Sequence, residues 1–241
     1  MRLYTGSIMS PIAENLQQVR ARISEALQGD SREVVLVAVS KTHPPEMVRE
    51  AFAAGQRDFG ENYVQEAAAK IAALADLPAA WHFIGTLQGN KARDVAERFD
   101  WVHAVDRARI AELLSRHRPA GRRPLNVCVE VNISEEATKS GVKPGEALAL
   151  ARLVATLPGL RFRGLMGMAS PSGDEARARA EFSVLRRELE AIRAAGIPGD
   201  TLSMGMSQDW RAALAEGATM LRIGTAIFGA REAHAWRAAS A

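Results

Sequence analysis

The segment VVLVAVSKTHPPEMV, residues 34–48, decides the fold. Its apolar run at 34–39 is typical of a parallel strand that is buried on both faces. Lys41 follows this run almost directly, and the prolines at 44–45 then favour the start of a helix. We therefore expect a buried strand, a lysine at its carboxyl end and a helix that packs back against the strand.

The same strand and helix pattern recurs along the whole chain. Strands are predicted at 34–40, 57–61, 81–85, 101–105, 126–133, 161–169, 201–206 and 220–228. Helices are predicted before the first strand at 10–27, and later at 44–55, 62–74, 106–117, 144–157 and 175–196. This alternation predicts an α/β protein with a single (β/α)8 TIM barrel and an additional N-terminal helix. The alternative, an open doubly wound sheet, lacks a glycine-rich dinucleotide loop after its first strand.

The chain of 241 residues suits one domain of this kind. No linker rich in proline, glycine or serine divides it. We expect one barrel domain at 10–241, preceded by a disordered N-terminal extension at 1–9. Met9 is a plausible alternative start.

Composition excludes several classes of protein. Hydrophobic residues make up 47% and charged residues 24%, which is ordinary for a soluble globular protein. The net charge of +3 is spread over many segments, so we expect no nucleic-acid partner. No apolar run reaches the roughly 20 residues of a membrane span. The single cysteine, Cys128, is expected to be a buried thiol in the core. One cysteine cannot form a disulfide within the chain, which fits a cytoplasmic location.

Lys41 is the first candidate functional residue. Active groups of TIM barrels lie at the carboxyl ends of the strands, where Lys41 is expected. A partly desolvated lysine loses its proton more readily, and a neutral amine can form a Schiff base with an aldehyde. The alternative is a surface lysine whose stem lies along the rim. Position alone leaves both interpretations open.

The segments after the last two strands form the second candidate. SMGMSQDWRAAL at 203–214 places Ser207 where a short helix is expected to begin, and RIGTAIFG at 222–229 supplies Gly224 and Thr225. Hydroxyl groups and exposed backbone N–H groups attract anions. Each glycine alone could simply permit a tight turn. Together, after strands 7 and 8, they favour a phosphate site.

A lysine for an aldehyde and a phosphate site in one barrel mouth indicate pyridoxal 5'-phosphate (PLP). Arg222 precedes Gly224 by two residues and could meet the pyridine nitrogen of that cofactor. An arginine there would keep the nitrogen unprotonated. The alternative for Arg222 is an ion pair at the rim of the core.

Several longer segments carry a resemblance to a known family. They are AVSKTHPPEMVREAFAAGQRDFGENYVQEAAAK at 38–70, WHFIGTLQGNKAR at 81–93, VNISEEATKSGV at 131–142, RGLMGMA at 163–169, and LSMGMSQDWRAALAEGATMLRIGTAIFGAR at 202–231. In this order they resemble the pyridoxal phosphate homeostasis protein family, over about residues 10–232. The fold of that family is similar to the N-terminal barrel domain of alanine racemase.

The resemblance implies a set of site residues and a role. It implies that Lys41 carries PLP, that Asn62 of the GENY segment lies near it, and that Arg222 faces the ring nitrogen. It also implies that Ser207, Gly224 and Thr225 hold the phosphate. The implied role is PLP homeostasis in the cytoplasm, by a monomeric carrier that is not an enzyme. PLP-dependent apo-enzymes are the expected recipients.

A racemase and a Schiff-base aldolase are the two enzymatic alternatives to the carrier role. Alanine racemase uses a second base, a tyrosine from a separate C-terminal domain, and we expect no such domain here because the sequence ends at Ala241. The tyrosines of this chain are Tyr4 and Tyr63, and we expect neither to be such a base. A Schiff-base aldolase would need an acid–base pair close to Lys41, and the sequence offers no convincing one.

The remaining polar candidates are less specific. His82 is either a mouth residue or a core histidine, and the other histidines, His43, His103, His117 and His234, have no metal-ligand spacing. Asn132 and Met166 either touch the cofactor or belong to the core. Asn90 and Lys91 are expected to cap the following helix.

Overall fold

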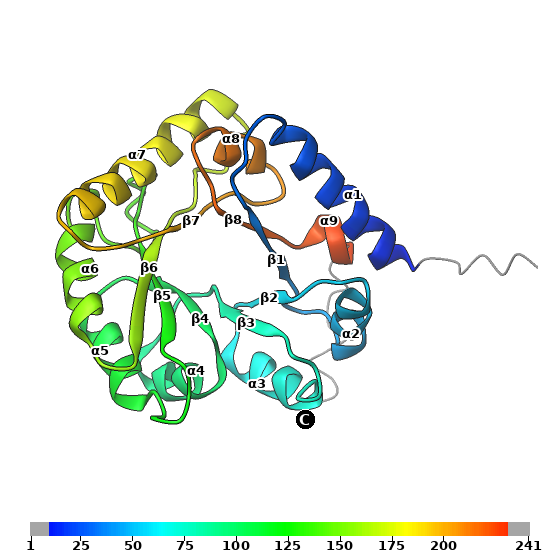
Figure 1. Cartoon of the computed structure of the whole chain (residues 1–241), viewed down its shortest axis with the longest axis horizontal. Helices are drawn as coiled ribbons and strands as arrows, with labels where there is room; N and C mark the ends of the chain where they lie inside the picture. Colours follow the sequence, from blue (N-terminus) through cyan, green and yellow to red (C-terminus); the bar gives the residue numbers. More distant parts are fainter. Residues whose placement is uncertain (1–9, 231–241) are drawn as a thin grey trace, which may run out of the picture.

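The computed structural model describes residues 10–230, so the extension expected at 1–9 lies outside the described range. Parallel strands close into a barrel in the order β1 to β8 (Figure 1), which confirms the predicted fold. The strands are β1 (Val35–Val39), β2 (Asp58–Glu61), β3 (Ala80–Phe83), β4 (Trp101–Val105), β5 (Leu125–Glu130), β6 (Leu160–Met166), β7 (Thr201–Ser203) and β8 (Met220–Ile223). β1 pairs with both β2 and β8, which closes the ring.

Helices surround the ring of strands (Figure 1). They are α1 (Pro11–Ala26), α2 (Pro45–Ala53), α3 (Val64–Ala73), α4 (Ala92–Arg98), α5 (Ala108–His117), α6 (Ala147–Thr156), α7 (Glu175–Ala194), α8 (Trp210–Ala215) and α9 (Thr225–Phe228), with a 3-10 turn, η1 (Gly89–Lys91), before α4. The additional N-terminal helix is α1. The Ser10 hydroxyl caps it by accepting from the Ala13 N–H at 3.3 Å.

α1 packs beside α2 and α9 on the outside of the barrel (Figure 1). The Asn15 side chain donates to the Ile227 carbonyl at 2.9 Å, which fixes α1 to α9. Leu16 and Val19 are among the buried residues of this helix. The two ends of the described chain are therefore joined on one side of the barrel.

Several predicted strands end earlier than expected, and the last one gives way to a helix. The sequence predicted a strand at 220–228, but β8 ends at Ile223 and residues 225–228 form the single-turn helix α9. The TAIF segment is short and apolar and fits a strand or a helix equally well. The break falls at Gly224, which comes close to β1.

The wall and the interior of the barrel differ in polarity. Apolar residues such as Val48, Phe59 and Phe182 are buried in the hydrophobic core. Side chains from β3, β4, β7 and β8 instead meet across the interior through hydrogen bonds. A polar chain thus runs inside the ring of strands.

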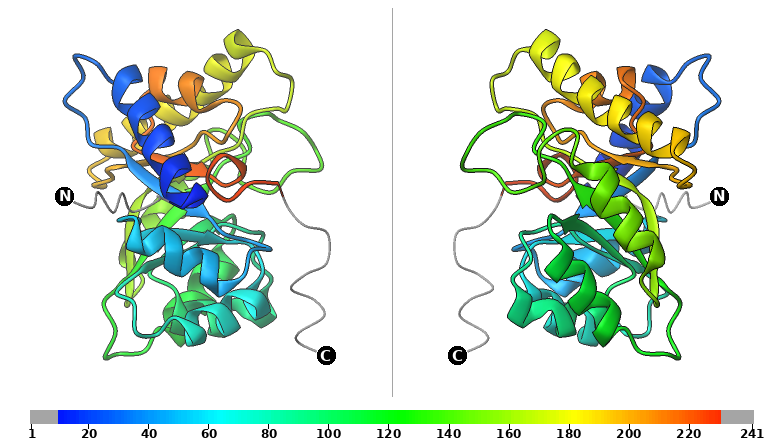
Figure 2. Two further views of the ribbon diagram at one scale, coloured as in Figure 1. Left: turned by 90° about the vertical axis from the view of Figure 1, so that its right-hand side faces the viewer. Right: turned by 90° about the vertical axis from the view of Figure 1, so that its left-hand side faces the viewer.

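The two ends of the barrel are distinct (Figure 2). The loops at 131–146 and 167–174 project on one side, and the loop at 27–34 that leads into β1 lies on the other. The first side is the carboxyl end of the strands, called the mouth below, and the second is the base. Within residues 10–230, no helix has both the length and the apolar character needed to cross a membrane.

Candidate functional site

A hollow at the mouth of the barrel is lined by all six residues that the sequence singled out. These are Lys41, Asn62, Ser207, Arg222, Gly224 and Thr225. They come from the ends of β1, β2, β7 and β8, far apart in the sequence. The closed barrel places them around one space because parallel strands bring their carboxyl ends to the same end of the barrel.

The backbone around Lys41 is fixed from α3. On one side of it, the Ser40 carbonyl accepts from the Lys70 ammonium at 2.8 Å. On the other side, the Thr42 N–H donates to the Glu66 carboxylate at 2.5 Å. Lys41 is therefore held between two anchored peptide groups.

These anchors belong to a buried ion cluster. Lys70 Nζ lies 2.6 Å from Glu61 Oε1 and 3.1 Å from Glu66 Oε1, and neither Lys70 nor Glu61 is exposed to solvent. The Ser40 hydroxyl also donates to Glu61, at 2.6 Å. Burial raises the pKa of the Glu61 carboxyl, although Lys70 acts in the opposite direction. The cluster therefore joins α3 and the end of β2 to the residues on either side of Lys41.

Thr42 lies in the left-handed region of backbone space, with φ of 67°. A β-branched residue is rarely found there, and such a conformation costs on the order of 1–3 kcal/mol. The Glu66 bond to its N–H is the visible contact that holds it. The turn after β1 is thus a strained segment directly beside Lys41.

The phosphate candidates lie in two neighbouring turns. Ser207 is in the turn that follows β7, and the Met206 N–H in this turn donates to Asp209 at 2.6 Å. The sequence placed Ser207 at the start of a helix, but α8 begins at Trp210. Asp209 is the N-cap of α8 and has a φ of −124°, outside the helical region, so residues 207–209 form a turn before the helix.

Gly224 allows the end of β8 to approach β1. A methyl group at this position would lie 3.0 Å from the Val39 carbonyl oxygen and 3.3 Å from Val39 Cβ. Only a residue without a side chain leaves this space open. The backbone of Gly224 and Thr225 therefore borders the hollow directly.

Arg222 is almost completely buried, with 4% of its surface exposed. Its guanidinium donates to the Ser203 carbonyl and hydroxyl, each at 2.7 Å, and to the Gly167 carbonyl at 3.2 Å. Burial lowers the pKa of Arg222 to about 10, against the opposing effects of Asp209 and Glu130. Arg222 remains a cation at neutral pH and lines the hollow.

Comparisons with known proteins show the family to which the chain belongs. The sequence profile described as "Alanine racemase, N-terminal domain" matches residues 9–232. The chain is 57% identical over 227 residues to the "Pyridoxal phosphate homeostasis protein" of Pseudomonas aeruginosa, covering 93% of this chain and 97% of that one. The protein of the same name from Escherichia coli is 51% identical over 235 residues, covering 93% and 98%.

The chain belongs to the pyridoxal phosphate homeostasis protein family. A solved relative, PipY of Synechococcus elongatus with PLP bound, has 41% sequence identity and a TM-score of 0.79. The match covers 90% of this chain and 100% of PipY. The resemblance inferred from the sequence motifs is confirmed, as is the relation to the alanine racemase barrel.

Asn62 contributes an unpaired polar atom to the hollow. Its Oδ1 atom is buried and has no hydrogen-bond partner among residues 10–230. Such an atom is costly to leave unpaired, because it has lost its contact with water. Since Asn62 lines the hollow, a polar group of a bound molecule would complete its hydrogen bonding.

Sequence reasoning missed other residues of the hollow. His43, Ile84, Met168 and Met206 also line it. His43 stacks on Phe228 at 5.2 Å between ring centroids. Ile84, Met168 and Met206 lie near the carboxyl ends of predicted strands, and His43 follows one, so the place of each in the chain was the available signal.

Other sequence candidates lie elsewhere. Met166 is buried in the barrel wall and His82 in the interior, and neither lines the hollow. Asn132 bonds its own loop, through the Glu136 carbonyl at 2.8 Å. Cys128 is fully buried, and burial raises the pKa of its thiol to about 12. Within residues 10–230, no cluster of His, Cys, Asp or Glu is suited to hold a metal ion.

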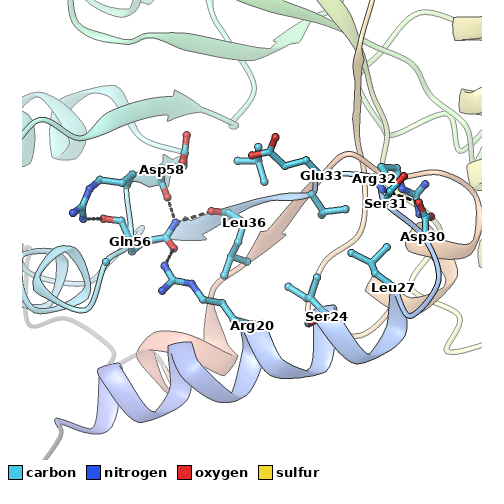
Figure 3. A pocket seen from close by; sticks show the side chains of 15 residues that line it. Arg20, Ser24, Leu27, Asp30, Ser31, Arg32, Glu33, Leu36, Gln56 and Asp58 are labelled. Atoms are coloured by element: carbon cyan, nitrogen blue, oxygen red, sulfur yellow. Dashed lines mark hydrogen bonds and ion pairs between the residues drawn. The ribbon is translucent and has the colours of Figure 1, made fainter.

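A larger hollow, of about 560 Å³, lies at the base of the barrel (Figure 3). Its polar groups largely bond one another. Arg20 donates to Gln56 at 3.0 Å, and Gln56 donates to the carbonyls of Leu36 and Asp58 at 2.6 and 2.7 Å. Size alone therefore does not identify the functional site. The smaller hollow at the mouth has Lys41 and the turns that follow β7 and β8, and the larger one has neither.

Proposed function

We propose that this protein binds PLP at the mouth of the barrel, as a Schiff base on Lys41, and takes part in intracellular PLP homeostasis. The observation that carries the proposal is the convergence of Lys41, Asn62, Ser207, Arg222, Gly224 and Thr225 on one hollow. The P. aeruginosa and E. coli relatives are named for this role. PipY, which has the same fold, has been solved with PLP bound.

Each residue has a distinct task in this proposal. Lys41 supplies the amine, and its anchored backbone keeps that amine at one place. Ser207 and Thr225 offer hydroxyl groups to the phosphate, and Gly224 offers backbone without a side chain in the way. Arg222 meets the ring nitrogen as a donor, since a guanidinium has no acceptor. Asn62 bonds a polar substituent of the ring.

The structure offers two features that fit this cofactor. The unpaired Asn62 oxygen calls for a polar ligand, and Gly224 keeps the turn after β8 close to the end of β1, which leads into Lys41. When bound, PLP supplies an aldehyde that can pass from one amine to another. The residues of this chain hold that aldehyde and exclude water from one side of it.

The protein acts as a carrier in this proposal, and turnover of amino acids is not its role. A racemase needs a second base over the ring, and Tyr63, the tyrosine near the mouth, has 55% of its surface exposed and does not line the hollow. Arg222 at the ring nitrogen would also make the ring a weak electron sink. The carrier works as a cytoplasmic monomer and delivers PLP to PLP-dependent apo-enzymes or buffers its concentration.

The test compares turnover with transfer. Protein loaded with PLP is incubated with L-alanine, and racemisation and keto-acid formation are followed. Turnover in the common enzymatic range of about 1–1000 per second would refute the carrier role and support a racemase. In parallel, activation of a PLP-dependent apo-enzyme is timed against release of PLP into buffer. Faster activation supports delivery, and equal rates support buffering alone.

A further inference from the structure

A chain of hydrogen bonds inside the barrel joins the base to Arg222. His82 on β3 lies 3.0 Å from Asp58 on β2 and 3.0 Å from His103 on β4, in each case between polar side-chain atoms. His103 lies 2.8 Å from the Ser203 hydroxyl on β7, and this hydroxyl accepts from Arg222 on β8 at 2.7 Å. The four inner members are buried. Asp58 lies at the start of β2, borders the base hollow (Figure 3) and has 29% of its side chain exposed.

The strand register carries the hydrogen-bond chain from the base of the barrel toward its mouth. Asp58 pairs with Ala80, and His82 comes two residues later on the same strand. His82 pairs with Trp101, and His103 again comes two residues later. Ser203 pairs with Met220, two residues before Arg222. Each of these steps between neighbouring strands therefore moves toward the mouth.

The residues at the two ends of the hydrogen-bond chain fix the same direction of donation along it. Asp58 as a carboxylate can only accept, so a neutral His82 donates from Nε2 and accepts at Nδ1. His103 then donates from Nε2 and accepts at Nδ1. At the other end, Arg222 can only donate, so the Ser203 hydroxyl is left to donate to His103 Nδ1.

The surroundings keep His103 neutral, as this arrangement requires. Burial lowers the pKa of His103 well below its usual value, and His82 and Arg222 lower it further. His82 stacks on Trp101 with ring centroids 5.4 Å apart, which fixes the plane of the ring. Chains of aligned hydrogen bonds polarise one another in a low-dielectric interior.

We propose that Asp58, His82, His103 and Ser203 are positioning residues that hold the Arg222 guanidinium at the cofactor site through a hydrogen-bond chain of fixed direction. The PLP site then senses the charge on Asp58 at the opposite end of the barrel. This inference rests on the proposed function only for its effect on PLP. Without the Asp58 charge, His82 is no longer required to donate, and the chain can reverse. A reversed His103 donates to Ser203 and competes with Arg222 for the hydroxyl oxygen.

The first experiment uses the protein without PLP. Two-bond proton–nitrogen correlation spectra of 15N-histidine-labelled protein show which ring nitrogens carry protons. We expect both His82 and His103 to be protonated at Nε2 and bare at Nδ1. A proton on Nδ1 of His103 in the wild-type protein would overturn the proposed direction. In Asp58→Asn, we expect a measurable population with the proton on His103 Nδ1.

The second experiment adds PLP labelled with 15N in its ring. Ser203→Ala removes the link between Arg222 and His103 but leaves the Ser203 carbonyl bond, and it should weaken PLP binding about ten-fold. Asp58→Asn should shift the ring-nitrogen resonance of bound PLP. Glu33→Gln is the matched control, because it removes an equal charge from the same base hollow without touching the chain.

The outcomes separate the two proposals. If Asp58→Asn and Ser203→Ala both match Glu33→Gln in affinity and in the ring-nitrogen resonance, the positioning role is wrong. If the wild-type protein does not bind PLP, the proposed function fails. The histidine spectra then still decide whether the chain has the inferred direction.

Discussion

Three charged side chains, one from the end of β2 and two from α3, contact the residues on both sides of Lys41. Lys70, Glu61 and Glu66 pair with one another and also bond the peptide groups on both sides of Lys41. A buried ion pair of this kind adds little to stability compared with apolar packing. Its value at this position is geometric, since it fixes the strained turn at Thr42 that carries the lysine.

Lys70→Met should therefore damage both stability and PLP binding. The variant leaves the Glu61 carboxylate buried without its partner, which should lower the free energy of unfolding by about 3–5 kcal/mol. The released Ser40 carbonyl should also weaken PLP binding at temperatures where the variant is folded. Denaturant unfolding and PLP titration measure the two effects.

Two further variants serve as controls for Lys70→Met. Lys91→Met, at η1, removes a lysine that is only partly buried and should change stability by less than about 0.5 kcal/mol. Glu66→Gln keeps an acceptor for the Thr42 N–H and should retain PLP binding better than Lys70→Met. Normal PLP affinity in folded Lys70→Met would show that the cluster does not position Lys41.

Glu130, at the carboxyl end of β5, should make stability fall between weakly acidic and neutral pH. Burial and Asp106 raise the pKa of Glu130 to about 7 from an ordinary value of 4.5. The neutral form is favoured in the folded protein, so its contribution is full below about pH 4.5 and is lost as the pH rises through about 7. The shift of about 2.5 units corresponds to about 3 kcal/mol as an upper figure.

Glu130→Gln tests this pH dependence. The amide resembles the protonated carboxyl, so the variant should match the wild type in stability near pH 4.5 and exceed it at pH 8 by about 1–3 kcal/mol. Chemical denaturation at the two pH values gives the difference. An equal difference at both values would mean that the charge of Glu130 is not responsible.

At the scale of elements, the turns after β7 and β8 form the proposed phosphate end of the site. Ser207 and Thr225 are the hydroxyl residues here, and Gly224 keeps β8 close to β1. These turns follow adjacent strands, so a small shift of one strand would change the positions of both turns. The phosphate contacts and the closure of the barrel are thus linked at Gly224.

Ser207→Ala should discriminate between two ligands. Loss of one hydrogen bond to a charged group costs about 1.5–3 kcal/mol, which is roughly a ten- to hundred-fold loss of affinity for PLP. Pyridoxal has no phosphate, and its binding should change little. Equal losses for PLP and pyridoxal, measured by absorbance titration, would place the phosphate elsewhere.

Gly224→Ala should lower stability as well as PLP affinity. Its methyl group would lie 3.0 Å from the Val39 carbonyl oxygen, and relief of this contact requires β8 to move away from β1. Overpacking of this kind typically costs about 1–3 kcal/mol. Gly121→Ala, at a glycine with open space around its Cβ position, is the matched control. Equal melting temperatures for the two variants would argue against the close approach.

The elements also show where sequence reasoning ended. The alternation of apolar runs with helical segments predicted the strands and most helices, because buried parallel strands have continuous apolar runs. It could not separate the end of β8 from α9, since TAIF fits both states. The helix start expected at Ser207 was wrong, since α8 begins at Trp210, after Asp209 with its non-helical φ of −124°.

At the scale of the whole molecule, the closed barrel joins residues that the sequence separates widely. That the six residues meet at the mouth could be predicted, Asn62 from the family resemblance and the others also from their places at strand ends. The hydrogen-bond chain inside the barrel could not be predicted from the sequence. It requires the pairing register of several strands, and His103 and Ser203 are 100 positions apart. Lys70 was missed for the same reason, since only the fold brings α3 beside β1.

The proposed function of the whole molecule depends on one covalent bond, the Schiff base between PLP and Lys41. The other lysines of the chain are Lys70, Lys91, Lys139 and Lys143, and Lys70 is fully buried and paired with Glu61. Purified protein loaded with PLP is reduced with borohydride, digested, and mapped by mass spectrometry, with Lys41→Ala as the control. The account predicts a visible absorption band that reduction removes, a pyridoxyl group on Lys41, and no band in Lys41→Ala. A pyridoxyl group on Lys91 or Lys139, with Lys41 unmodified, would contradict it.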